Sequence, residues 1–368
     1  MNPIGLYIHI PFCRSKCPYC DFYSCTGSRE LWVPYVRRVR EELKAWARKF
    51  PIPADTLYLG GGTPSLIGGE LLAEMIQSAA SLFSLPENAE ITVECNPSSC
   101  TPELFRRLKG TGVNRISLGM QSAVETERKK LGRRSGPEEV EQCVEWARDA
   151  GLQNLSLDLM MGTPGQTSRS VLESVRFCTR LQIPHVSSYL LKLEEGTPFY
   201  SRADYLALPD EDEVCEIYLA ASRELEESGL CQYEISNFAR PGMESRHNLK
   251  YWNGKEYLGI GPAAHSFLNG KRFYYPRDLA GFLSGARPVP DGEGGDFEEY
   301  VLLRLRLSAG LDGQAVSTRF GHPIPEPMLR RARELEKNGL ARCSDTGFRL
   351  TREGFLLSNS AIAHILYG

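Results

Sequence analysis

The chain has 368 residues, of which 42% are apolar and 24% are charged, and its formal net charge is −3. This composition is typical of a globular protein, and the near balance of charge gives no indication of polyanion binding. No segment approaches 18 uncharged apolar residues, so no transmembrane span is predicted. The start, MNPIGLYIHIP, lacks a basic region and a signal cleavage site. We therefore expect a cytoplasmic protein whose eleven cysteines are metal ligands or buried thiols rather than disulfides.

Short β-rich runs alternate with helix-like stretches over the first half of the chain. The predicted strands are residues 6–10, 56–60, 90–94, 114–119, 155–161 and 185–191. The clearest helices between them are residues 33–50, 138–150 and 170–181. This alternation indicates right-handed βαβ units and a parallel sheet, and therefore an α/β fold. Six such strands predict an open, partial (β/α)6 barrel, with a doubly wound sheet as the alternative.

Polar and glycine-rich segments follow the predicted strands. GGGTPS follows the second strand, CNPSS the third, GMQS the fourth and GTPGQT the fifth. In parallel α/β folds the carboxyl ends of the strands carry the site, so we expect these segments to form one shared site.

The second half of the chain begins with a predicted amphipathic helix at residues 208–229. An aromatic and glycine-rich segment follows at 232–267, and PVPDGEGGD at 288–296 is predicted to be a linker or long loop. Helices at 298–310 and 327–339, a hairpin at 341–351 and a helix at 351–366 predict a small, winged-helix-like α+β domain. The predicted division is a barrel at 1–230, a connecting region at 231–290 and a C-terminal domain at 291–368.

Three cysteines form a C-x3-C-x2-C cluster directly after the first predicted strand: Cys13, Cys17 and Cys20. Such a cluster can bind zinc, bind an iron–sulfur cluster or act as a redox relay. Zinc would need a fourth ligand, for which His9 is available. A [4Fe–4S] cluster held by three thiolates would leave one iron open to an external amine and carboxylate.

The position of this motif resembles the radical S-adenosylmethionine (SAM) superfamily, whose members reduce the cluster and cleave SAM to a 5′-deoxyadenosyl radical. The resemblance implies that the turn of Gly61, Gly62 and Thr63 contacts the SAM amino group. It also implies that Tyr19 packs against adenine and that Tyr7 lies over the cluster.

Four further polar residues follow successive strands and are candidate SAM contacts. Glu94 suits a ribose hydroxyl or the amino group, and Asp158 can accept a hydrogen bond from the ribose. Gln121 follows the fourth strand, and the planar guanidinium of Arg133 suits the SAM carboxylate.

The segments GLYIHIPFCRSKCPYCDF, VECNP, LGMQS and LDLMMGTPGQ also resemble the oxygen-independent coproporphyrinogen III oxidase (HemN-like) group. The decarboxylating oxidase carries a fourth cysteine where this chain has Phe22, and it has a longer N-terminal extension. HNLKYW, residues 247–252, matches the H-N-x-x-Y-W motif of HemW-type haem chaperones. A neutral imidazole is a normal axial haem ligand, so His247 is a candidate haem contact.

The sequence therefore predicts a haem chaperone that passes haem to acceptor proteins, respiratory proteins among them, and that carries a SAM-coordinated [4Fe–4S] cluster. No residue is assigned a catalytic role. The alternative is a radical SAM enzyme that decarboxylates coproporphyrinogen III or acts on another tetrapyrrole. Nucleic-acid binding through the basic helix at 327–339 is not expected, because acidic residues interrupt it. The sequence leaves the oligomeric state open.

Overall fold

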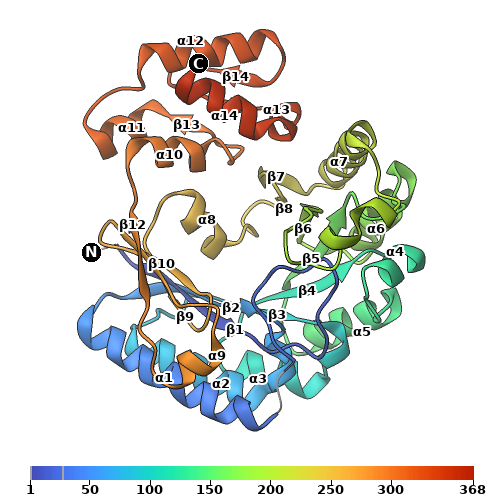
Figure 1. The fold of residues 1–368 in the computed structure, drawn as a ribbon, viewed down its shortest axis with the longest axis vertical. Coiled ribbons are helices and arrows are strands. Elements are labelled where there is room, and N and C mark those ends of the chain that lie inside the picture. The colour runs from blue at the N-terminus through green and yellow to red at the C-terminus, as the bar shows by residue number, and fades with distance from the viewer. Residues whose placement is uncertain (1, 27–28) are drawn as a thin grey trace.

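The computed structural model describes residues 2–26 and 29–368. Its centre is a sheet in which six parallel strands lie side by side in chain order. These strands are β1 (Ile4–Ile10), β2 (Ala54–Gly61), β3 (Glu90–Cys95), β4 (Arg115–Gln121), β5 (Asn154–Met161) and β6 (His185–Leu190). The helices between them are α1 (Trp32–Lys49), α2 (Gly69–Leu82), α3 (Pro102–Gly110), α4 (Glu125–Lys130), α5 (Pro137–Asp149) and α6 (Ser168–Arg180). They cover the outer face of the curved sheet, which confirms the predicted partial barrel (Figure 1).

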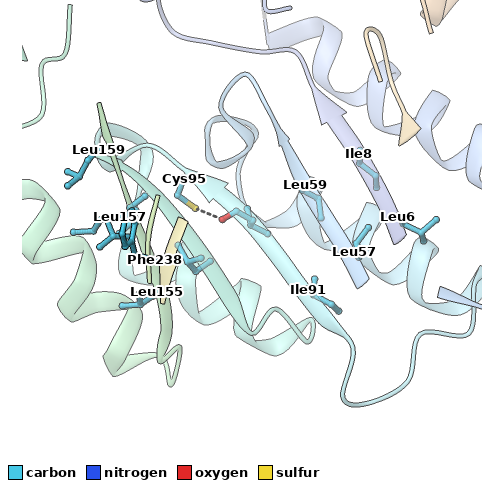
Figure 2. Packing of buried hydrophobic residues seen from close by; sticks show 14 of the residues in the cluster. Leu6, Ile8, Leu57, Leu59, Ile91, Cys95, Leu155, Leu157, Leu159 and Phe238 are labelled. Carbon is cyan, nitrogen blue, oxygen red and sulfur yellow. Dashed lines mark hydrogen bonds between the residues drawn. The ribbon is translucent and has the colours of Figure 1, made fainter. Parts of the chain in front are cut away.

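The two faces of the barrel strands differ in character. Apolar side chains on alternate positions pack under the helices, as Leu57, Leu59 and Leu157 do (Figure 2). The intervening positions turn to the inside and are mostly polar, as with Thr92 and Ser156, which are fully buried. The hydrophobic core therefore lies between sheet and helices, and the inside of the barrel is a polar space.

Further strands extend the sheet at both edges. β8 (Asn237–Ala239) and β7 (Cys231–Glu234) follow β6, whereas β9 (Tyr257–Ile260), β10 (His265–Leu268), β11 (Lys271–Tyr274) and β12 (Val289–Glu293) follow β1. The predicted connecting region thus adds strands to both edges, and the predicted domain boundaries stay predictions. The prediction of a linker at 288–296 is wrong over β12. This segment pairs antiparallel with β11 as an exposed edge strand, the position in a sheet that tolerates Pro290.

The C-terminal domain lies beyond β12 and contains a small three-stranded sheet. Its elements are α10 (Phe297–Arg304), β13 (Leu311–Asp312), α11 (Gly313–Phe320), α12 (Glu326–Lys337), β14 (Ala341–Cys343), β15 (Gly347–Leu350), α13 (Arg352–Leu356) and α14 (Ser358–Tyr367). This element order confirms the winged-helix-like prediction. Two helix predictions were too long. Residues 305–310 leave the helix because Leu307 forms a bridge with Glu234, and the terminal helix is broken at Leu357.

Three helices connect these parts: α7 (Glu211–Glu227), α8 (Arg246–Trp252) and α9 (Leu279–Leu283). Short 3-10 helices occur at η1 (Arg29–Leu31), η2 (Pro64–Ile67), η3 (Pro97–Ser99) and η4 (Tyr200–Tyr205). Within residues 2–26 and 29–368, no helix has both the length and the apolar character needed to cross a bilayer.

Candidate cofactor site at the carboxyl ends of the strands

The three cysteines of the motif lie on the loop between β1 and η1, at the carboxyl end of the barrel. All three are half-buried and free. The base of the loop is closed by backbone hydrogen bonds from Cys13 N to Cys25 O (3.0 Å) and from Cys25 N to Pro11 O (2.7 Å). A third bond, from Cys20 N to Cys17 O (3.1 Å), forms a tight turn inside the loop. The loop is therefore held at both ends while its thiols face partly outward.

The donor set of the loop, three free thiols on one short segment, is of the kind that holds an iron–sulfur cluster. Burial raises the pKa of Cys20, and the charges of Cys17 and Cys13 raise it further, so the three thiols lie near one another. In the described part of the chain, no three His, Cys, Asp or Glu groups are close enough together to hold one metal ion. A [4Fe–4S] cluster takes each thiolate on a different iron, so its ligands need not meet at one point.

The glycine turn after β2 packs directly against the cysteine loop. Gly62 N donates to Ile10 O and Thr63 N donates to Phe12 O, both at 2.8 Å. Thr63 Oγ1 lies 3.6 Å from Cys13 Sγ. A Cβ atom on Gly62 would come within 2.8 Å of Phe12 O. The glycine turn therefore packs closely against the backbone of the protein itself. Its contact with SAM stays a prediction.

His9 on β1 connects the barrel interior to the far end of the cysteine loop. Its Nε2–H donates to Tyr23 O (2.8 Å), so its Nδ1 accepts from the Tyr7 hydroxyl (3.0 Å). Burial lowers the pKa of His9 to about 4, which keeps the ring neutral. Both ring nitrogens have protein partners in this arrangement, so His9 positions the loop rather than serving as a zinc ligand.

Two predicted carboxylates, Glu94 and Asp158, lie inside the barrel near its carboxyl end. Glu94 accepts from the Tyr58 hydroxyl (2.8 Å) and from Gly61 N (3.0 Å). Asp158 accepts from the Ser117 hydroxyl (2.9 Å). Burial raises the pKa of Glu94 to about 7 and that of Asp158 to about 6, and the charge of Asp158 adds to the rise at Glu94. Two partly protonated carboxyl groups are suited to receive a cation.

Arg133 reaches back from the end of α4 to both the sheet and the cysteine loop. Its guanidinium donates to Gly119 O and lies 3.8 Å from Cys17 Sγ. Gln121 ends β4 in a left-handed conformation (φ +73°), and its side-chain nitrogen would lie 3.3 Å from a Cβ at position 119. The structure brings the two predicted residues together around Gly119, and their contacts with SAM stay predictions.

Tyr19 lies under the loop that follows β6. Its ring is 6.2 Å from that of Phe199, and Phe199 N donates to Pro18 O (3.0 Å). Leu131 and Met160 belong to the same small apolar cluster. The β6–α7 loop therefore packs against the C-x2-C turn. The contact of Tyr19 with adenine and that of Tyr7 with the cluster stay predictions.

His247 lies at the opposite end of the barrel from the cysteines. Helix α8 places it in the amino-terminal end of the strands, where it is 1% exposed. Its Nδ1 hydrogen-bonds Thr56 Oγ1 and its Nε2 hydrogen-bonds the Tyr251 hydroxyl, both at 2.8 Å. Its ring stacks on Tyr58 with centroids 5.3 Å apart. Burial lowers its pKa to about 3. Neither nitrogen is free for a haem iron in this conformation. Haem contact by His247 stays a prediction, and it would require one of these two hydrogen bonds to break.

The rest of α8 is fixed just as firmly. The carboxylate of Glu90 accepts from Arg246 N (2.8 Å) and His247 N (2.9 Å), at the positive end of the helix. Lys250 pairs with Asp55 at 2.6 Å. At the other end of the helix, Arg304 of the C-terminal domain donates to Asn253 Oδ1. The H-N-x-x-Y-W segment therefore closes the amino-terminal end of the barrel.

Sequence reasoning missed three residues that complete the site. Tyr58 and Ser117 are the donors to Glu94 and Asp158, and Tyr189 lies at the end of β6, where the charge of Asp158 contributes to the rise in its pKa. The available signal was the polar residue at every second strand position, a pattern that is unusual for a parallel sheet covered on both faces.

The outer part of the cysteine loop carries Asp21 and Phe22. Arg277 forms a salt bridge with Asp21 at 2.9 Å. This hydrogen bond lowers the pKa of Asp21, and the charges of Lys16 and Lys192 lower it further. Phe22 is 70% exposed.

Comparison with known proteins agrees with these features. The model of the radical SAM superfamily matches residues 7–178, and that of the HemN C-terminal domain matches residues 296–357. The chain is 36% identical to the "Heme chaperone HemW" of Mycobacterium tuberculosis (strain CDC 1551 / Oshkosh), over 99% of this chain and 95% of the relative. It is 36% identical to the HemW of Escherichia coli (strain K12) and 32% identical to that of Bacillus subtilis (strain 168), over 98% of each chain.

The fold has a close counterpart among solved structures. Coproporphyrinogen III oxidase (HemN) from Escherichia coli superposes with a TM-score of 0.84 over 99% of this chain and 90% of the oxidase, at 20% identity. This likeness establishes the radical SAM fold together with its C-terminal domain. On the near full-length relatives and the superfamily match, the chain belongs to the HemW family of radical SAM proteins.

Proposed function

We propose that this protein binds haem and transfers it to acceptor proteins, and that it carries a [4Fe–4S] cluster with SAM bound at the open iron. The single observation that best supports this function is the near full-length identity of 36% with proteins named as haem chaperones. We place the protein in the cytoplasm, with respiratory proteins among its acceptors.

The chain's own residues would divide the cofactor work as follows. Cys13, Cys17 and Cys20 would hold the cluster, and Glu94 and Asp158 would bind the cationic and ribose groups of SAM. The cluster, when bound and reduced, supplies the electron that can cleave the sulfonium. Because the pKa values of both carboxyls are raised by burial, a bound cation would restore their ionised forms.

Arg133 would hold the SAM carboxylate from the other side of the cysteine loop. Its guanidinium lies beside Cys17 Sγ and Gly119 O, and its planar donor pair would suit a carboxylate bound next to the cysteines. Tyr19 and the β6–α7 loop would cover the adenosine from water.

The deciding experiment measures the iron–sulfur cluster, SAM binding and haem binding on one sample. Anaerobically reconstituted protein should show a reduced-cluster electron paramagnetic resonance signal that changes on addition of SAM, and haem titration should give a saturable Soret band. An apo-acceptor mixed with the haem-loaded protein should then gain haem. Absence of a Soret shift would reject the chaperone function, whereas zinc at the three cysteines would reject the cofactor assignment.

A coupled assay tests the enzymatic alternative. Incubation of the reconstituted protein with coproporphyrinogen III, SAM and a reductant should leave the substrate unchanged. Formation of protoporphyrinogen would show a decarboxylase instead.

A further inference from the structure

Two arginines lie directly opposite each other on the outer face of the small C-terminal sheet. β14 and β15 form an antiparallel hairpin in which Arg342 is paired with Arg349. Both arginine side chains are exposed, whereas Ala341, Phe348 and Leu350 are buried on the inner face. Like charges that lie directly opposite on neighbouring strands destabilise a sheet, so folding alone does not explain this arginine pair.

The protein itself does not neutralise the pair. Among the residues that the structure describes, neither Arg342 nor Arg349 forms a salt bridge, and Arg349 donates to a backbone carbonyl, Ser308 O, at 3.3 Å. The carboxylates nearby have other donors. Asp312 accepts from a backbone N–H at the start of α11 (2.7 Å), and Glu336 accepts from a backbone N–H of β14 (2.7 Å). Both guanidiniums are therefore available to an external anion.

An open hollow lies over this face of the sheet. It has a volume of about 320 Å³ and is lined by both arginines together with Ser344 and Thr346, which lie between β14 and β15. A glycine leaves room for one of the arginines, because a Cβ atom at Gly310 would lie 2.5 Å from Arg349 Cβ. The hollow therefore offers a ligand two cationic side chains and two hydroxyl groups.

We propose that the arginine pair, Arg342 and Arg349, binds an acidic segment of a partner protein. A guanidinium presents its N–H donors in a planar fork that matches a carboxylate, so two adjacent arginines can hold two carboxylates. Paired Cα atoms of an antiparallel ladder lie about 5 Å apart, and alternate residues of an extended chain lie roughly 6.6 Å apart on one side. The segment that fits is therefore extended, with two acidic residues separated by one other residue. This inference goes beyond the proposed function and requires neither the cluster nor haem.

Acidic groups around the pair favour a short peptide over a nucleic acid. Asp312 lines the same hollow, Asp345 lies between β14 and β15, and Glu336 contacts the backbone of β14. A nucleic-acid strand carries a phosphate about every 3.4 Å, so a strand laid across the hollow would bring further phosphates against these carboxylates. A peptide with two acidic residues brings two charges to two arginines.

Fluorescence anisotropy of dye-labelled peptides tests the pair on the full-length protein at about 20 mM salt, where charges are weakly screened. One peptide carries Glu-x-Glu in a Gly/Ser background, and its control carries Gln-x-Gln. The wild type should bind the acidic peptide about tenfold more tightly, since each exposed ion pair contributes at most about 1 kcal/mol. Arg342→Gln combined with Arg349→Gln should abolish this difference. A wild type that binds both peptides equally would overturn the proposal.

A matched variant controls for net charge. Arg330→Gln combined with Lys337→Gln removes the same charge from exposed positions of α12 and should bind the acidic peptide like the wild type. An equal loss in this control would attribute the binding to net charge and overturn the arginine pair. Thermal unfolding separates a structural role. Removing both arginines should leave Tm unchanged or slightly raised, because repulsion is relieved. A lower Tm with unchanged peptide binding would make the pair structural and reject the proposal.

Charge reversal gives the sharpest test. Arg342→Glu combined with Arg349→Glu should lose the Glu-x-Glu peptide and gain binding of a Lys-x-Lys peptide, which the wild type should not bind. Failure of this exchange would count against a direct contact. Single-stranded DNA that binds more tightly than the acidic peptide, and that is lost in the Gln variant, would assign the site to nucleic acid and overturn the proposal. Haem titration of the same variants should match the wild type, so a failure of the proposed function would be seen separately.

Discussion

Single buried groups inside this barrel have environments that change their ordinary chemistry. Glu94 and Asp158 are carboxyls with raised pKa values. Each accepts a hydrogen bond from a neutral hydroxyl, that of Tyr58 or Ser117, and neither forms a salt bridge among the described residues. A hydroxyl satisfies a carboxylate oxygen without neutralising its charge, so these sites favour a positively charged ligand.

Binding of SAM should therefore depend on pH through Glu94. Since the ionised carboxylate attracts a cation and the protonated form does not, affinity should rise with pH through about 7, by up to tenfold per unit below that value. Equilibrium dialysis from pH 6 to 8 measures this slope. Glu94→Gln should bind more weakly with a flatter slope, whereas the exposed Glu125→Gln should match the wild type. An affinity that is constant over this range would refute the assignment.

His247 should contribute mainly to stability. His247→Ala leaves the hydroxyls of Thr56 and Tyr251 without their partner in a buried space and removes the stack on Tyr58, which should lower the free energy of unfolding by about 2–4 kcal/mol. Urea denaturation of the cluster-free protein measures this loss. His265→Ala, at an exposed position, should change stability by less than about 0.5 kcal/mol. Equal stability of the two variants would leave His247 free for a ligand role.

At the scale of elements, the cysteine loop gets its shape from neighbours that are distant in sequence. The glycine turn after β2 bonds its base, and Arg277 binds its outer part. Gly119 on β4 leaves space for Arg133, because a Cβ there would lie 2.9 Å from the guanidinium. The Arg133 side chain therefore explains why residue 119 is a glycine.

Gly119→Ala should therefore displace Arg133 and weaken SAM binding about tenfold, the effect of losing one charge-assisted hydrogen bond of roughly 1.4 kcal/mol. Gly110→Ala is the matched control, since a Cβ at that position in α3 meets no atom within 4 Å. Calorimetric titration with SAM compares the two. Unchanged affinity in Gly119→Ala would exclude Arg133 as a SAM contact.

The elements themselves were largely predictable, because their signals are local. Six strands and the winged-helix order follow from the alternation of β-rich and helical patterns. β12 was missed because Pro290 and Gly292 are typical of a loop, and only its pairing with β11 makes the segment a strand. Residues 305–310 have a helical sequence pattern. They leave the helix because of a contact with β7, which is distant in the sequence and therefore could not be predicted from it.

The location of the candidate site in the fold was predictable for the same reason, whereas the roles of its residues stay predictions. Residues that follow strands could be assigned to one end of the barrel from topology alone. The position of α8 could not be predicted from the sequence. Nothing near residue 247 shows that Glu90 and Thr56 hydrogen-bond to His247. The hydroxyl donors to the two carboxylates needed the register of neighbouring strands.

Considered as a whole, the molecule balances two sets of buried titratable groups. Burial raises the pKa of Glu94, Asp158 and Glu234, while it lowers the pKa of His9 and His247. The acids hold protons in the folded state that they lose when unfolded, and the histidines do the reverse. Between about pH 5 and 7 the two contributions to stability therefore oppose each other.

Replacing one buried acid, Glu234, should reveal how much it contributes to the pH dependence of stability. The pKa of Glu234 is raised by burial to about 7, so the wild type should lose stability relative to Glu234→Gln as pH rises from about 4.5 to 7. The difference can reach about 3 kcal/mol, at 1.36 kcal/mol per pKa unit. Urea denaturation at several pH values follows it. Glu227→Gln, on the exposed face of α7, should show no such trend, and a flat difference for Glu234→Gln would contradict its raised pKa.

The position of α8 in the amino-terminal end of the barrel has a consequence for how a ligand reaches the candidate site. Because His247 and Glu90 hold α8 in that end of the barrel, a molecule bound to Glu94 and Asp158 would enter and leave past the cysteine loop at the carboxyl end. With SAM bound there as proposed, its exchange would require the space beside the cysteine loop to be open.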